Sequence, residues 1–287
     1  MNVSHHEAKD WLGLNWSAWT NLHPENDQLS SLSSTPGLYR VRHTAKDGLE
    51  YIGETGRTRG RVRALARESH RDVMPYRDPH TAAPCLWAVR DATGPGLEIS
   101  ITTPDWAENA QRRKGLEAAL IAVHRRETGE SPTANFGRII SGYEQSSYSK
   151  DGVRGGPLGP NEMEPNAEPG VGPLPWEQAN AVTAQDWMGL DWSEPFRLRD
   201  RLDVSPPDTG LYRVWYDDQT QPLAYIGESS SLPRRLYNHE NEFGGDALAS
   251  FVARPDLDAQ HKRLEIETEL IGAHYLTHDR PPVDQFG

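Results

Sequence analysis

Two tyrosines and an arginine recur at matching spacing in the two halves of the chain. The arginine follows the second tyrosine after ten residues in both halves. An arginine fork can bind a phosphate and neutralise its charge, and a phenol can pass a proton to or from an attacking water. The pattern therefore predicts chemistry on a phosphate ester. The residues concerned are Tyr39, Tyr51 and Arg61 in the first half and Tyr212, Tyr225 and Arg235 in the second.

A single glutamate stands later in each half, three residues before a Leu-Ile pair that a helix would turn towards the core. These glutamates are Glu117 and Glu267. One carboxylate can hold one Mg²⁺, because this ion prefers oxygen ligands and keeps most of its waters. With the tyrosines and the arginine, such a carboxylate completes a set of groups suited to metal-assisted hydrolysis.

These residues belong to an internal repeat that covers most of the chain. Five sequence blocks return in the same order, which indicates a duplicated domain. Between the copies lies GVRGGPLGPNEMEPNAEPGVGPLP, whose Gly and Pro content is typical of flexible linkers. We therefore expect a domain at 1–142, an acidic linker at 143–180 and a second domain at 181–287. The repeated blocks are DWLGLNWS and DWMGLDWS, PGLYRV and TGLYRV, EYIGE and AYIGE, LEAALIAVH and IETELIGAH, and SPTANFG and PPVDQFG.

The elements that must position these residues can be predicted in outline. GLYRVRH and LEYIGE are short runs of strand type joined by a polar turn, so they predict a β-hairpin with the two tyrosines on neighbouring strands. Segments 58–73 and 111–129 show helical spacing, and the second ends at Gly129. CLWAVRD and LEISITTP predict a further strand pair, which SFVARPD replaces in the second copy. The predicted fold class is α/β (α+β), with two small domains that each hold a short, mainly antiparallel sheet flanked by helices.

The order GLY, YIG, Arg, Glu and a final NFG resembles the GIY-YIG nuclease superfamily, and the resemblance covers both halves. It implies a compact domain that hydrolyses phosphodiester bonds in DNA with one divalent metal, Mg²⁺ or Mn²⁺. By this resemblance Glu117 and Glu267 are the metal ligands, one tyrosine of each pair activates or positions the water, and the arginine holds the scissile phosphate. Asn135, in NFG, helps to fix the geometry of the first site.

The two copies depart from the family pattern in different ways. His239 stands four residues after the arginine of the second copy, where some restriction enzymes of the family carry a catalytic histidine. The first copy has Leu65 there and must do without the imidazole or borrow His70. The second copy has Gln285 in place of the asparagine. Neither change marks a copy as inactive, so catalytic residues are expected in both.

Four arginines lie at four-residue steps along segment 58–73, namely Arg59, Arg63, Arg67 and Arg71. They would share one face of the predicted helix. A solvated face is one interpretation. Like charges in a row repel one another unless something anionic lies against them, so our hypothesis is a track for DNA phosphates. The second copy has fewer arginines there, and the first copy is therefore expected to hold the DNA.

Several other motifs have both a structural and a functional interpretation. The tryptophans of the DWxGLxW blocks are expected to anchor an N-terminal segment on each domain rather than to stack on bases. His124 and His274 repeat in the long helix, and packing is favoured because no second ligand stands at metal spacing. Glu54 and Glu228 are interpreted as strand-end surface residues rather than extra metal ligands. Cys85, the only cysteine, is expected to be buried and inert.

The composition bounds the function classes. The formal net charge of −12 argues mildly against a polyanion partner, although arginine, the residue suited to phosphate, supplies most of the 30 basic residues. The acidic excess lies in the linker and the second half. No apolar run approaches the ~20 residues that cross a bilayer, and the first residues lack the apolar core of a signal peptide. We therefore expect a cytoplasmic protein with no membrane partner.

The leading hypothesis is a Mg²⁺-dependent tandem DNA endonuclease of a restriction or phage-defence kind. A domain with one metal cuts one strand, so two tethered copies could cut both strands of a duplex within a monomer. In a variant of this hypothesis the first copy cuts and the second serves recognition. Two alternatives remain, a non-catalytic nucleic-acid- or protein-binding module that retains the fold, and a structure-specific DNA repair nuclease.

Overall fold

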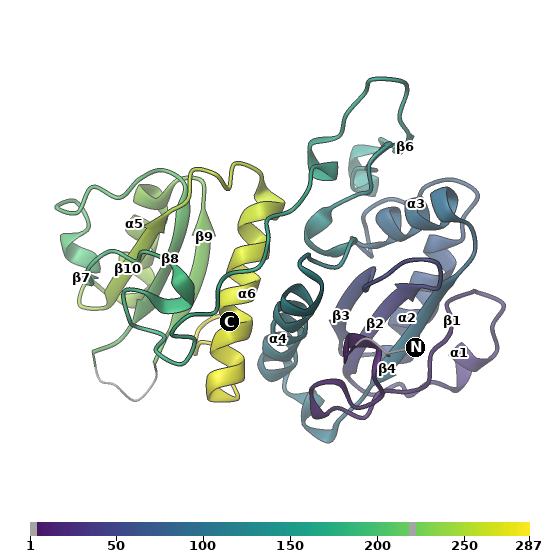
Figure 1. The fold of residues 1–287 in the computed structure, drawn as a ribbon, viewed down its shortest axis with the longest axis horizontal. Helices are drawn as coiled ribbons and strands as arrows, with labels where there is room; N and C mark the ends of the chain where they lie inside the picture. The colour runs from purple at the N-terminus through teal and green to yellow at the C-terminus, as the bar shows by residue number, and fades with distance from the viewer. Residues whose placement is uncertain (1–4, 218–221) are drawn as a thin grey trace. The chain divides into compact units, whose positions relative to one another are not determined.

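The computed structural model describes residues 5–217 and 222–287 (Figure 1). Its contacts divide the chain into two compact units. Unit 1 comprises Met1–Arg113 and Glu127–Gly170, and unit 2 comprises Lys114–Arg126 and Val171–Gly287. These boundaries differ from the expected ones, because part of the expected linker packs with unit 1 and a stretch of helix from the first half packs with unit 2.

Unit 1 is built on a four-stranded antiparallel sheet in the order β1-β4-β2-β3. Its strands are β1 (Thr20–Asn21), β2 (Gly37–His43), β3 (Tyr51–Thr55) and β4 (Leu97–Thr102), and a separate pair comprises β5 (Tyr143–Glu144) and β6 (Gly156–Pro157). The helices are α1 (Gln28–Ser31), α2 (Thr58–Ser69), α3 (Ala83–Thr93) and α4 (Ala110–Thr128), whose middle belongs to unit 2. Short 3-10 turns lie at His5–Glu7, Trp11–Gly13, Asp105–Glu108, Asn135–Gly137, Ser149–Asp151 and Pro165–Ala167.

Unit 2 repeats this arrangement with a sheet in the order β7-β10-β8-β9. Its strands are β7 (Phe196–Arg197), β8 (Gly210–Trp215), β9 (Tyr225–Ser229) and β10 (Leu248–Ala253). The helices are α5 (Leu232–Phe243) and α6 (Gln260–His278), with 3-10 turns at Trp187–Gly189 and Leu198–Asp200. The two small, mainly antiparallel sheets with flanking helices confirm the predicted mixed α/β class.

The strand expected at CLWAVRD is wrong, because Ala83–Thr93 form helix α3. Every residue from 83 to 89 is buried, so the segment shows neither the alternation of a half-buried strand nor the stripe of a surface helix. Pro84, in the first turn of α3, is a residue that suits a helix start. Both tyrosine hairpins and the strand at LEISIT are confirmed. In unit 2 the chain passes from α5 directly to β10, which occupies the place of β4.

A buried arginine of the second strand anchors the tryptophan segment of unit 1. Arg40 on β2 donates to the carbonyl of Ala8 at 2.9 Å and lies 4.3 Å from the ring centroid of Trp16. Burial lowers the pKa of this guanidinium to about 9, so it keeps its charge at neutral pH. Trp16 is fully buried, which confirms anchoring and leaves no ring face for a base.

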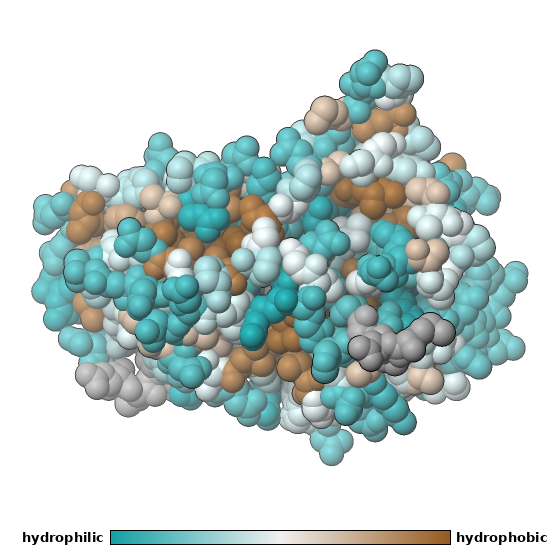
Figure 2. All heavy atoms as spheres, viewed as in Figure 1, coloured by the Kyte–Doolittle hydropathy of each residue, from teal (hydrophilic) through white to brown (hydrophobic). Residues whose placement is uncertain are grey.

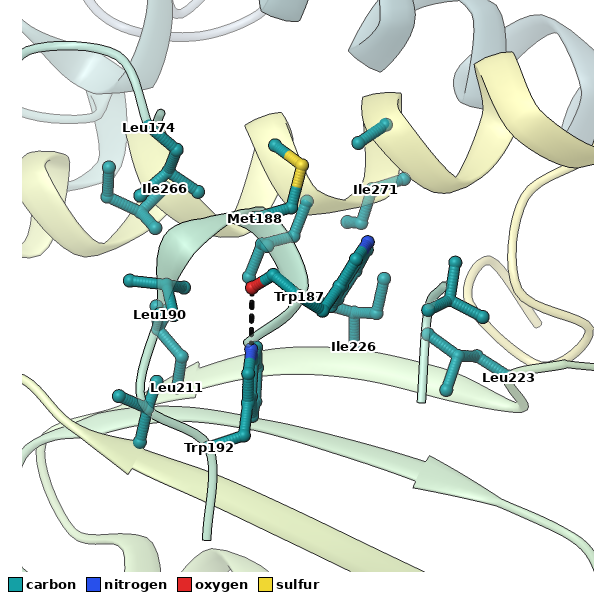
Figure 3. Close-up of a cluster of buried hydrophobic side chains, with 14 of the residues drawn as sticks. Leu174, Trp187, Met188, Leu190, Trp192, Leu211, Leu223, Ile226, Ile266 and Ile271 are labelled. Carbon is teal, nitrogen blue, oxygen red and sulfur yellow. Dashed lines mark hydrogen bonds between the residues drawn. The ribbon is translucent and has the colours of Figure 1, made fainter. Parts of the chain in front are cut away.

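Unit 2 repeats this anchor. Arg213 on β8 donates to the carbonyl of Ala184 at 2.9 Å and lies 4.2 Å from the ring centroid of Trp192. Trp192 Nε1 in turn donates to the carbonyl of Trp187 at 3.0 Å, and Figure 3 shows both rings packed in the core between the sheet and α6. The repeated block therefore encodes a cation–π anchor that joins the tryptophan segment to its sheet.

The outer surface is mainly hydrophilic in the view of Figure 2, with separate apolar patches. This character fits the mean hydropathy of −0.75. Among the helices of residues 5–217 and 222–287, none combines the length and the apolar character needed to cross a membrane.

The repeated helix histidines are packed in the interior. His124 and His274 are each 1% exposed, and His274 Nδ1 lies 3.1 Å from the carbonyl oxygen of Arg280. Burial, reinforced by His278, lowers the pKa of His274 to about 3. A neutral, buried imidazole that donates to a carbonyl fits the packing interpretation.

Acid should destabilise unit 2 in part through His274. The unfolded chain takes up this proton near pH 6.5, whereas the folded protein resists it down to about pH 3, so unfolding is favoured as pH falls through this window. His274→Asn keeps a donor for the Arg280 carbonyl but cannot be protonated. Between about pH 6.5 and about pH 4.5 the variant should lose about 2–3 kcal/mol less unfolding free energy than the wild type. Urea unfolding at several pH values measures this difference, and equal losses would contradict the prediction.

Candidate active site

Two tyrosine rings meet on one face of the sheet in unit 2. Tyr212 on β8 pairs with Gly227 on β9, and Tyr225 stands two residues before that glycine, so the tyrosines are diagonal neighbours. Their ring centroids are 6.0 Å apart and their planes differ by 16°. A side chain at position 227 would collide with the Tyr212 ring, and one at Gly53 would lie 2.6 Å from Cζ of Tyr39. The glycine of YIG is therefore what lets the two rings approach.

Arg235 joins the two hydroxyl groups from helix α5. Its Nε donates to Oη of Tyr212 at 2.9 Å, and its Nη2 donates to Oη of Tyr225 at 3.4 Å. Burial raises the pKa of both phenols, although Arg235 opposes this effect. Burial alone would lower the pKa of Arg235, but its hydrogen bonds to the tyrosines raise it overall. At neutral pH the site therefore holds two protonated phenols around one guanidinium cation.

His239, one helical turn after Arg235, continues this network. Its Nε2 lies 2.8 Å from Oη of Tyr212, and its Nδ1 lies 2.9 Å from a carboxylate oxygen of Glu242. Burial, with Arg235 nearby, lowers the pKa of His239, so the imidazole is neutral at pH 7. A carboxylate at Nδ1 selects the tautomer with its proton there, which leaves Nε2 to accept the proton of Tyr212.

The two tyrosines differ in their access to solvent. Tyr212 is fully buried, whereas Tyr225 is half-buried, and Arg235 donates to the hydroxyl groups of both. The two hydroxyls, bridged by Arg235, and the imidazole thus lie in the order Tyr225, Tyr212 and His239. Such a chain can carry a proton from the outer end of the site to its interior.

Glu267, on α6, lies beside the tyrosine pair. Burial raises its pKa to about 8, the negative charge of Glu228 adds to this shift, and the backbone N–H of Glu228 and the cation of Arg235 oppose it. Within the described ranges, no group of three or more His, Cys, Asp or Glu side chains is placed to hold a metal. A site at Glu267 would thus have one carboxylate ligand, with water and phosphate oxygens as the others, which suits Mg²⁺.

Glu54 and Glu228, in the YIG strands, are half-buried, and each pairs with an arginine of a long helix. Nε of Arg113 donates to Glu54 at 2.5 Å, and Nε of Arg263 donates to Glu228 at 2.6 Å. Both arginines stand four residues before the candidate ligands of their helices, Glu117 and Glu267 on α4 and α6. The pairs fasten each long helix to the end of the YIG strand, and nothing in the sequence pattern singled them out.

Unit 1 repeats the first part of the constellation. The ring centroids of Tyr39 and Tyr51 are 5.8 Å apart, and Nε of Arg61 donates to Oη of Tyr39 at 3.2 Å. The structure places Glu117, half-buried, on the stretch of α4 that packs with unit 2. It therefore brings three of the expected residues together in unit 1, and all five of the second copy together in unit 2.

The histidine of unit 1 comes from an unexpected place. Leu65 is buried at the position that corresponds to His239, and His70 bonds within its own turn, with Nδ1 2.9 Å from the carbonyl oxygen of Ala66. Instead, Nδ1 of His80 contacts Nη1 of Arg61.

Asn135 and Gln285 have the same contacts in the two units. The side-chain oxygen of Asn135 accepts from the backbone N–H of Ile52 at 3.1 Å, and its amide nitrogen donates to the Ile52 carbonyl at 3.0 Å. Gln285 bonds Ile226 in the same way, at 2.9 Å for each contact. Each amide binds the edge strand β3 or β9 next to its second tyrosine. The extra methylene of glutamine is thus absorbed without loss of the contact.

The arginines of segment 58–73 do not all stand on α2, because the helix ends at Ser69, before Arg71, and three of the four have partners nearby. Arg67 and Arg71 both pair with the buried Glu68, at 3.2 and 2.5 Å, and Nε of Arg59 donates to the backbone carbonyl of Leu32 at 2.6 Å. The repulsion that suggested an external anion is therefore weaker than expected. Arg63 is exposed and, with Arg67, lines a cavity of about 340 Å³. The phosphate-track hypothesis thus depends chiefly on Arg63.

Comparison with protein-family models, with curated proteins and with solved structures finds no match to this chain.

Proposed function

We propose that the protein is a divalent-metal-dependent DNA endonuclease with a GIY-YIG-type site in each unit. The observation that carries this proposal is the convergence of five side chains from β8, β9, α5 and α6 on one network, namely Tyr212, Tyr225, Arg235, His239 and Glu267. Each has a role that phosphodiester hydrolysis needs. The three residues gathered in unit 1 support a second site of the same kind.

In the proposed reaction the network removes a proton from the attacking water. Tyr225, at the outer end, takes this proton on its oxygen while its own proton passes to Tyr212. Tyr212 in turn gives its proton to Nε2 of His239, which Glu242 keeps in the accepting tautomer. Arg235 is placed to neutralise the charge that grows on the phosphate oxygens. The leaving oxygen takes its proton from solvent.

Glu267 fits the role of holding a Mg²⁺ or Mn²⁺ ion. Glu267 is half-buried, and a second carboxylate, that of Glu228, lies nearby. Arg263 pairs with Glu228. A bound cation would polarise the phosphodiester and stabilise the leaving oxygen. The resemblance in sequence proposes the same role for Glu117 in the first copy.

Plasmid cleavage tests the proposal. Wild-type protein, Glu117→Ala, Glu267→Ala and the double variant are incubated with supercoiled plasmid and Mg²⁺ at low and high salt, with the exposed Glu130→Ala as a matched control. We expect linear product from the wild type and the control, nicked product from each single variant, and no product from the double variant. Failure of the wild type to cut any DNA, including modified and single-stranded forms, would favour a non-catalytic binding module.

Two working sites would give the duplication a purpose, since each strand of a duplex would meet its own site within one chain. A cytoplasmic location and a restriction or defence role belong to the proposal by analogy. A structure-specific repair nuclease would share the chemistry, and cleavage of branched DNA in preference to plasmid would identify it.

Arg63→Glu should weaken DNA binding measurably. Arg63 is exposed and lines the cavity, whereas the exposed Arg67 and Arg71 are paired with Glu68. Losing one phosphate contact should reduce the slope of log affinity against log salt by about 1, and the reversed charge should lower affinity about tenfold at low salt. Arg234→Glu, an exposed arginine of unit 2, makes the same charge change and should have the smaller effect. Equal effects of the two variants would argue against a track on α2.

A further inference from the structure

Arg61 has partners that its counterpart in unit 2 lacks in the described contacts. Beyond Tyr39, its Nη1 donates to the carbonyl oxygen of Pro79 at 3.1 Å and contacts Nδ1 of His80. The known hydrogen bonds of Arg235 go instead to its two tyrosines. The first site therefore orients its arginine with a segment outside the tyrosine hairpin.

His80 is buried, with an exposed fraction of 5%, and burial together with Arg61 lowers its pKa to about 4. The imidazole is thus neutral at pH 7, and its Nδ1 accepts a hydrogen bond from the guanidinium. A carboxylate in this place would cancel the charge of Arg61. A neutral imidazole fixes the direction of the guanidinium and leaves its full positive charge for a phosphate.

The loop that carries His80, residues 70–82 between α2 and α3, is itself held in place. The carboxylate of Asp78 accepts from the backbone N–H of Ser149 at 2.6 Å and from its hydroxyl group. The backbone N–H of Arg77 donates to the carbonyl of Ser147 at 3.1 Å, and Arg154 donates to the carbonyl of Met74 at 2.7 Å. Residues 147–154 form a clasp over this loop.

We propose that His80 is a positioning residue of the first site, which accepts a hydrogen bond from Arg61 and holds its guanidinium for the scissile phosphate. The clasp of residues 147–154 supports it by fixing the loop. This inference rests on the proposed nuclease function. It means that the two copies use their histidines differently: His239 bonds the phenol of Tyr212, whereas His80 bonds the arginine.

The test uses the full chain with Glu267→Ala, in which only the first site can nick plasmid. His80→Leu removes the acceptor, whereas His80→Asn offers its side-chain oxygen near the place of Nδ1. We expect His80→Leu to lower the maximal nicking rate about 10–100-fold, as misplacement of a binding group does, with little change in KM, and His80→Asn to stay within about threefold of the parent. His70→Leu, at the start of the same loop, is the matched control.

Several results would overturn the inference. One is full activity of His80→Leu, and another is an equal loss in His80→Asn, which would indicate a merely structural role. A loss of the same size in the Glu117→Ala background would show that the effect does not belong to the first site. If the Glu267→Ala parent does not nick plasmid, the proposed nuclease function of the first site is wrong, and the inference about His80 is wrong with it. If the parent nicks plasmid and His80→Leu is as active as the parent, only the inference about His80 is wrong.

The clasp gives a second, independent readout. Asp78→Ala removes the acceptor for Ser149, so the nicking rate of the first site should fall several-fold. Combined with His80→Leu it should cause no further loss, because both changes act through the same contact. Losses that multiply would contradict a clasp that works through His80.

Discussion

Arg125→Met should destabilise unit 2 by about 3–5 kcal/mol, because the change leaves two buried carboxylates without their cation. Arg125 is fully buried on α4, with its guanidinium 2.9 Å from Glu269 and 3.4 Å from Glu265, both also fully buried. Its Nη2 also donates to the carbonyls of Val171 and Gly172 at 3.1 and 3.0 Å. The variant would therefore lose the ion pairs with both carboxylates and the hydrogen bonds that hold the backbone at Val171 and Gly172.

The pH dependence gives this prediction a distinctive signature. Without Arg125, the folded-state pKa of Glu269 should rise further, because burial already raises it and Arg125 opposes that shift. The folded variant then binds protons more readily than the unfolded chain, so its stability falls as pH rises. The cost of the substitution should be larger at about pH 8 than at about pH 5.

Hydrogen exchange of α6 peptides, together with urea unfolding, measures the effect in the right unit. Arg126→Met is the matched control, because Arg126 is exposed and lies over the Trp176 ring at 4.4 Å. It should cost less than about 1 kcal/mol. A control as damaging as Arg125→Met, or a cost that is the same at both pH values, would argue against the buried charge pair as the cause.

His239→Leu should lower nicking by the second site about 10²–10⁴-fold, measured in the Glu117→Ala background. The imidazole is the terminal acceptor for the proton that leaves Tyr212, at 2.8 Å, and leucine offers no acceptor. Burial and Arg235 lower the pKa of His239, so the base form persists at neutral pH. The nicking rate of the second site should therefore begin to fall only at a pH below the usual pKa range of histidine.

Two variants of α5 serve as controls for this prediction. Glu242→Gln removes the carboxylate that orients His239, but its side chain is 61% exposed, so a loss of about tenfold or less is expected. Glu240→Gln, which touches Arg201 rather than the histidine, should leave the rate unchanged. Wild-type activity of His239→Leu would exclude the proton chain and leave His239 as a packing residue.

Patterns local in the chain predicted much of this protein. The tyrosine hairpins and the long helices were predicted from alternation and helical spacing, because these periods are imposed by the backbone itself. The duplication was visible in five ordered blocks. The strand predicted at CLWAVRD was wrong, because a segment buried on every side shows neither the two-residue period of a strand nor the 3.6-residue period of a surface helix. Its packing between α2 and the β5 region is seen only in the structure.

Partners distant in the chain escaped prediction, and the candidate site depends on them. Arg113 reaches Glu54 across 59 residues, and Arg61 meets His80 rather than His70 because residues 147–154 hold the intervening loop. In sequence Gln285 differs from Asn135, whereas in the structure both amides bond the edge strand in the same way. Such pairings are decided by how elements dock, and no spacing rule encodes them.

The sequence by itself determined the two copies, the class of fold, and the spacing of tyrosine, arginine and glutamate, since each follows from short-range geometry. Only the tertiary structure decided which side chains surround them. It selected His239 for the phenol and His80 for the arginine, enclosed Glu228 and Glu54 with arginines, and assigned part of α4 to unit 2. The physical reason is that burial and charge at a site are set by every element packed against it, whereas a sequence pattern reports only the element on which a residue stands.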